Sequence, residues 1–82
     1  MRRRWRRADD ALFAAVISGR DGTRYHLIAE QLPSDDSWDW TVWRPGDAPT
    51  AARHGVAASA VEAMRAAEAA VRRWDDTTAS DA

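Results

Sequence analysis

The alternation of apolar and polar positions predicts a β-hairpin in the first half of the chain. An apolar run over residues 11–18 is followed by turn-forming residues and by a second run over residues 23–30. The sequence Asp21-Gly22 between two such runs is typical of a two-residue hairpin loop, because both loop positions need a positive φ. A loop of this length places Val16 opposite Leu27.

This register predicts which side chains share a face of the sheet, since directly opposed residues point the same way. One face would carry Leu12, Ala14 and Val16 together with Tyr25, Leu27 and Ala29. The other face would carry Phe13, Ala15 and Ile17 against Arg24, His26, Ile28 and Glu30.

A third strand is predicted over residues 38–44, where Trp38 and Trp40 alternate with polar positions. Trp43 has the opposite parity and would therefore lie on the other face. The proline-containing and glycine-containing segment 45–49 ends this strand. Residues 50–54 would add a fourth strand if they pair with it.

The second half of the chain predicts a helix that begins after Ser59. Ser59 and Glu62 have the spacing of a capping box, in which each side chain bonds a free amide of the first turn. The apolar stripe of this helix is Val61, Met64, Ala67, Val71 and Trp74. We expect Val61, Met64 and Val71 to pack on Trp38 and Trp40.

These elements predict an α+β fold in which one C-terminal helix covers one face of an antiparallel sheet of three or four strands. The 82 residues suffice for a single domain, expected over 11–74. Residues 1–10 are expected to be a flexible basic arm and residues 75–82 a flexible acidic tail.

Charge is distributed unevenly along the chain. Five of the twelve basic residues, all arginine, fall within the first seven positions, whereas the thirteen acidic residues follow later. The formal net charge of −1 therefore combines a basic arm with an acidic body.

The chain has no cysteine, which excludes disulfides, thiolate zinc sites and cysteine nucleophiles. This composition is compatible with a reducing cytoplasm, where we expect the protein. The start of the chain resembles a secretory signal, but Asp9 and Asp10 at the edge of a short apolar run argue against one. No apolar run reaches the about 20 residues of a membrane helix, so no membrane partner is expected.

No catalytic constellation is recognisable, and the sequence predicts a protein that is not an enzyme and needs no cofactor. His26 would lie on the open face and His54 in a loop, and neither belongs to a nucleophile motif. The adjacent acids are typical of caps and turns. The scattered glycines form no phosphate loop, and no calcium or other metal motif is present.

The segment from Gly55 to Ala69, with a glycine and a capping serine ahead of a helix rich in Glu and Ala, resembles a recurring bacterial pattern. It is similar to short uncharacterised proteins of GC-rich proteobacteria and, more distantly, to the HicB-type antitoxin N-terminal domain. The resemblance implies strands that lead into a helix, and it assigns no functional residue.

Two hypotheses for function follow. In the first, the protein is an interaction module, self-associating or binding another protein through the uncovered face of its sheet, with the contact residues Phe13, Ile17, Ile28 and Trp43. In the alternative, the N-terminal arm binds nucleic acid or an acidic partner through Arg2, Arg3, Arg4, Trp5, Arg6 and Arg7.

Overall fold

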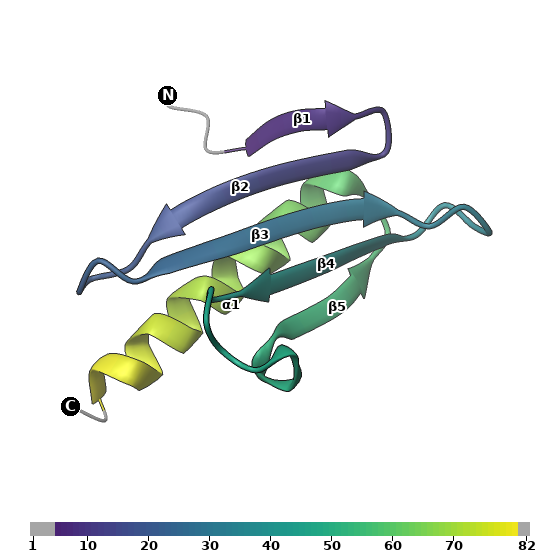
Figure 1. Ribbon diagram of the computed structural model, residues 1–82. Coiled ribbons are helices and arrows are strands. Elements are labelled where there is room, and N and C mark those ends of the chain that lie inside the picture. Colours follow the sequence, from purple (N-terminus) through teal and green to yellow (C-terminus); the bar gives the residue numbers. More distant parts are fainter. Residues whose placement is uncertain (1–4, 81–82) are drawn as a thin grey trace.

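A five-stranded antiparallel sheet is covered on one face by a single helix in the computed structural model, which describes residues 5–80 (Figure 1). Each strand pairs with the next one in the chain, so the sheet is a meander in the order β1-β2-β3-β4-β5. The elements are β1 (Trp5–Asp9), β2 (Leu12–Ser18), β3 (Arg24–Gln31), β4 (Trp38–Trp43), the short 3₁₀ helix η1 (Pro49–Ala51), β5 (Arg53–Ala57) and α1 (Ala60–Ser80). The α+β class is confirmed.

The sheet has five strands where three or four were predicted, and β1 and β5 form its two edges. Strand β1 falls within the segment expected to be flexible, and it pairs with β2 from Trp5 to Asp9. The fourth predicted strand forms as β5, three residues later than expected, because Pro49 fixes the backbone angle that starts the turn of η1. Residues 1–4 of the expected arm lie outside the described residues.

The predicted register of the first hairpin is wrong by one residue. The loop between β2 and β3 has three residues, since the amide of Gly22 donates to the carbonyl of Gly19 at 3.2 Å and the amide of Gly19 to the carbonyl of Thr23 at 2.7 Å. Gly22 has a φ of +87°, as expected for the residue that follows a type I turn in such a loop. The odd loop length shifts the pairing, so that Ala15 rather than Val16 lies opposite Leu27.

This shift exchanges the two faces of β2. Phe13 and Ile17, predicted on the open face, lie on the helix face opposite Ala29 and Tyr25. Val16, predicted in the core, lies on the open face and is 51% exposed. Strand β4 keeps its predicted orientation, since Trp38 and Trp40 face the helix and Trp43 does not.

The core forms where α1 crosses β3, β4 and β5, and its helical side is built mainly from alanines. Ala63 and Ala67 are fully buried, and the small side chains let the helix approach the large rings of the sheet. Val61 was predicted in this contact but is 51% exposed. The buried helical residues are Ala63, Ala67, Ala70, Val71 and Trp74.

The predicted start of the helix is confirmed. The amide of Glu62 donates to Ser59 Oγ at 3.2 Å, and the amide of Ala63 donates to the Ser59 carbonyl at 3.0 Å. Ser59 is therefore the N-cap and satisfies an amide that the first turn leaves free.

The helix continues to Ser80, past Trp74, after which a flexible tail was predicted, and Asp75 and Asp76 contact the loop between β2 and β3. The carboxylate of Asp75 accepts hydrogen bonds from the hydroxyl of Tyr25 at 3.1 Å and from the amide of Arg20 at 3.2 Å. The guanidinium of Arg20 also pairs with Asp76. These contacts hold Asp75 and Asp76, the first two residues of the predicted tail, and residues 81–82 lie outside the described residues.

Ionisation of Tyr25 should make the protein sensitive to alkaline pH. Burial raises the pKa of this phenol above its ordinary value of 10.0, and the hydrogen bond to the Asp75 carboxylate raises the pKa further. Because the folded pKa lies above the unfolded one, this stabilisation is fully present below pH 10 and is lost as pH rises through the folded value.

The chain has one tyrosine and no lysine or cysteine, so Tyr25 is its one side chain that titrates in this range. We expect an absorbance titration to give a midpoint above 10.0, and the free energy of unfolding to fall above that pH. In Tyr25→Phe the free energy of unfolding should stay flat over the same range. A midpoint at the ordinary value in the folded protein would contradict this assignment.

Candidate functional site

The face of the sheet that points away from α1 is covered by no other element within residues 5–80 (Figure 1). The strand register assigns alternate residues of every strand to this open face. They are Arg6 and Asp9 from β1; Leu12, Ala14, Val16 and Ser18 from β2; Arg24, His26, Ile28 and Glu30 from β3; Asp39, Thr41 and Trp43 from β4; and His54 and Val56 from β5.

An apolar band runs across the open face, with Val16, Ile28 and Trp43 in its two central rows and Val56 in the outer row, opposite Asp39. Val16 is 51% exposed and Val56 65% exposed, while Ile28 and Trp43 are half-buried by their neighbours in the sheet. Trp43 stacks on His26 of the adjacent strand, with ring centroids 5.5 Å apart. Two of the four predicted contact residues, Ile28 and Trp43, thus lie here, and the register error accounts for the other two.

Charge differs between the two ends of the open face. Arg24 lies at the end where β3 begins, opposite Ser18. Glu30 lies at the other end, directly opposite Asp39 of β4. Like charges opposed across two strands are destabilising, so the acidic end favours a nearby cation.

The described part of the predicted basic arm lies against the body of the protein. Trp5 is half-buried on the helix face, where its indole Nε1 donates to Glu68 Oε2 at 2.7 Å. Arg7 pairs with Asp10 at 3.0 Å, and Arg6 is exposed on the open face. Trp5 would have to leave the core to stack on a nucleic-acid base. Arg2, Arg3 and Arg4 lie outside the described residues.

The two histidines lie on separate strands of the open face. His26 lies on the open face, as predicted, whereas His54 lies in β5 rather than in a loop and is exposed. Across residues 5–80, no group of three His, Cys, Asp or Glu side chains is arranged to hold a metal ion.

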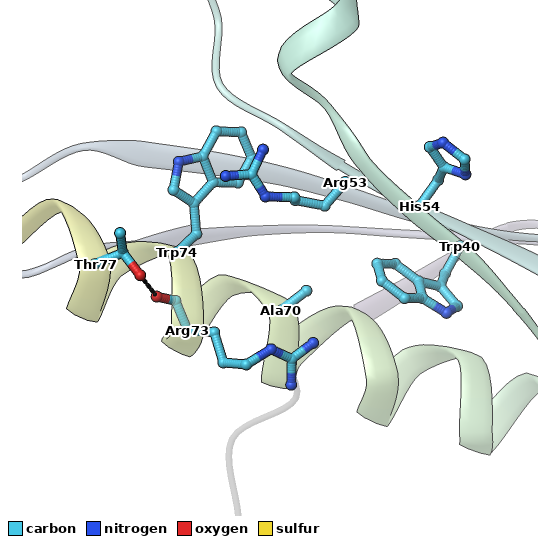
Figure 2. Close-up of a pocket in the computed structure, with 7 residues that line it drawn as sticks. All are labelled: Trp40, Arg53, His54, Ala70, Arg73, Trp74 and Thr77. Atoms are coloured by element: carbon cyan, nitrogen blue, oxygen red, sulfur yellow. Dashed lines mark hydrogen bonds between the residues drawn. The ribbon is translucent and has the colours of Figure 1, made fainter.

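A groove of about 380 Å³ between β5 and α1 is a feature that the sequence analysis missed. Figure 2 shows Trp40 and Trp74 on either side of Ala70, with Arg53 extending from β5 and Arg73 from α1. His54 and Thr77 complete the lining. The helical period places Trp74 on the sheet, but no local pattern indicates that Arg53 lies above it, because this requires the position of β5.

Two arginine side chains lie over the indole ring of Trp74. The guanidinium carbon of Arg53 lies 4.0 Å from the centre of the indole ring, and that of Arg44 lies 4.4 Å from it. Arg44 is paired with Asp47 at 2.6 Å, while Arg53 donates to the carbonyl of Ala51 at 2.7 Å. The ring is 6% exposed, so both cations cover an indole that is part of the core.

Among residues 5–80, no helix has the length and apolar character needed to cross a membrane. Comparisons with protein-family models, with curated proteins and with solved structures find no match to this chain. The resemblance to short proteobacterial proteins and to the HicB-type domain therefore stays a prediction.

Proposed function

We propose that this protein is a non-enzymatic interaction module that self-associates through the open face of its sheet. The observation that carries the proposal is the apolar band, in which Val16, Ile28, Trp43 and Val56 lie on one face that no other described element covers. Burial of such a band against another surface is favourable because it removes apolar area from water.

Charge complementarity supports a second copy as the occupant. A two-fold axis that lies in the plane of the interface, perpendicular to the strands, reverses the strand direction of one sheet relative to the other. The basic end of each copy, at Arg24, then faces the acidic end of the other, at Glu30 and Asp39. A cation from the second copy would relieve the repulsion within that acidic pair.

The sizes of the side chains fit the same arrangement. Val16 and Trp43 belong to one row across the sheet, and Ala14 and Thr41 belong to the next row. An axis between the two rows brings Val16 of one copy over Ala14 of the other and Trp43 over Thr41, while His26 lies over Ile28. Alternation of large and small residues of this kind lets two faces interdigitate.

The area of the face indicates a weak dimer. With strands about 4.8 Å apart and about 3.4 Å per residue, five strands of five, seven, eight, six and five residues offer roughly 500 Å². A standard interface takes about 800 Å² from each partner. Association should therefore depend strongly on protein concentration.

Val16→Glu should weaken self-association at least tenfold, because it places a charge in the apolar band. Sedimentation equilibrium from about 10 μM to about 1 mM would measure the dissociation constant. Val61→Glu is a matched control, since Val61 is also 51% exposed but lies on α1, away from the open face. A wild-type monomer over the whole range, or an equal effect of both variants, would overturn the proposal.

A charge exchange tests the two-fold arrangement itself. Arg24→Glu and Glu30→Arg should each weaken the dimer, and the double variant should recover most of the affinity because the complementary ends are restored with reversed sign. Added salt should weaken the wild-type dimer. Single variants without effect would exclude this orientation of the two copies.

Binding of nucleic acid or an acidic partner by the arginine arm is the alternative, and it rests on residues 2–7. Titration of labelled DNA and RNA into the full chain and into a variant lacking residues 1–4, which keeps Trp5 in place, separates the two proposals. Salt-sensitive binding that is lost in the shortened chain, together with a wild-type monomer, would favour the alternative.

A further inference from the structure

The groove between β5 and α1 combines aromatic walls with a cationic rim. The indoles of Trp40 and Trp74 flank the buried methyl group of Ala70, and the guanidinium groups of Arg53 and Arg73 extend from the two elements that form its sides (Figure 2). Its volume of about 380 Å³ lies at the lower end of the range for small-molecule sites. The dimensions therefore suit a small molecule.

Positive charge in the groove is not compensated locally. The lining contains two arginines and no carboxylate, although the chain carries thirteen acidic residues. Arg44 and Arg53 both lie over Trp74, and only Arg44 has a carboxylate partner among the described ion pairs. An anion bound at Arg53 would neutralise the second charge and reduce the repulsion between the two guanidiniums.

Arg53 is also held in place before a ligand arrives. Its stacking on a buried ring and its hydrogen bond to the carbonyl of Ala51 fix the guanidinium and leave other N–H groups free to donate. The guanidinium is planar, and the spacing of its N–H donors matches that of the oxygens in a phosphate or a carboxylate. Immobilising this long side chain in advance lowers the entropy lost on binding.

We propose that this groove binds a small organic anion, in which a phosphate or carboxylate group is carried by a planar ring. Arg53 contacts the oxyanion, Arg73 adds positive charge on the helix side of the groove, and the ring lies against Trp40, where contact with apolar surface and ring edges is favourable. Trp40, Arg53 and Trp74 lie on the opposite side of the sheet from the proposed self-association face, and His54 on the edge strand β5 is the one lining residue that the register assigns to the open face.

Nitrogen–proton correlation spectra of the full chain test this directly, because each of the five tryptophans gives one indole signal. The probes are two matched pairs, AMP with adenosine and benzoate with benzamide, which differ in the oxyanion. We expect an anion to shift the signals of Trp40 and Trp74 and to leave that of Trp43 unchanged. The neutral member of each pair should bind at least tenfold more weakly, and comparison of AMP with benzoate identifies the preferred oxyanion.

Arg53→Gln should reduce the affinity for the binding anion at least tenfold, and Arg73→Gln should reduce it by a smaller factor. Arg72→Gln is the matched control, since Arg72 is the exposed neighbour of Arg73 on α1 but does not line the groove. The dispersion of the indole signals reports whether each variant is folded. Absence of binding by both anions to about 10 mM, equal binding of the neutral probes, or an equal loss in Arg72→Gln would overturn the proposal.

Discussion

Trp74→Ala should lower the free energy of unfolding by about 3–5 kcal/mol, the usual cost of removing a large buried aromatic side chain. The indole is 6% exposed and contacts the ring of Tyr25 edge-on, with centroids 5.7 Å apart. Its loss would leave a cavity and would also remove the surface on which Arg44 and Arg53 lie. Because small domains are stable by only about 5–15 kcal/mol, much of the variant could be unfolded at physiological temperature.

Urea unfolding followed by circular dichroism measures this effect. Trp74→Phe serves as a control, because it keeps an aromatic ring in the same place and should cost less than the alanine variant. Arg72→Ala, on the exposed side of the same turn, should change the free energy of unfolding by no more than about 0.5 kcal/mol. A Trp74→Ala variant as stable as Arg72→Ala would show that α1 does not pack on the sheet through this residue.

Trp40→Ala should cost more than Trp43→Ala, although the two tryptophans lie three residues apart on β4. Trp40 packs against the buried residues of the core, and its ring lies so close to β5 that a Cβ at Gly55 would be 2.7 Å from its Cζ2 atom. We expect a loss of about 3 kcal/mol or more for Trp40→Ala. Trp43 lies on the open face, and its main aromatic contact is His26.

The two variants should be compared at low protein concentration, so that association through the open face does not add to the stability of Trp43. The stability difference between Trp43→Ala and the wild type should grow with protein concentration, because only the wild type gains stability from association through the open face. If Trp43→Ala were the costlier change in dilute solution, the assignment of the faces of β4 would be wrong.

The helix and β4 could be predicted from sequence because their patterns are local. The capping box at Ser59 marks the helix start, and strict alternation from Trp38 assigns the faces of β4. The register of β2 could not be predicted, since residues 12–17 are all apolar and either face could be the buried one. Asp21-Gly22 is compatible with loops of two and of three residues, and the loop length decides the register.

The remaining features depend on contacts between distant parts of the chain. Strand β1 contains three charged residues, so its sequence does not have the pattern of a strand. Its first residue, Trp5, attaches it to the helix through the hydrogen bond to Glu68. The alanines of α1 lie in the core because they fit under Trp38 and Trp40, whereas the pattern of large apolar residues alone favoured Val61. The groove could not be found from sequence, since Arg53 and Trp74 are brought together by the packing of β5 on α1.

The meander order of the sheet has a consequence for how the chain folds. Each strand pairs only with its neighbour in sequence, so the sheet can form by successive closure of short loops, which is the rapid case for β-structure. The contacts with large sequence separation are those of α1, such as Trp5 with Glu68 and Tyr25 with Asp75. Docking of the helix should then be the slow, cooperative step, and substitutions in its buried alanine stripe should retard folding more than substitutions in the hairpin loops.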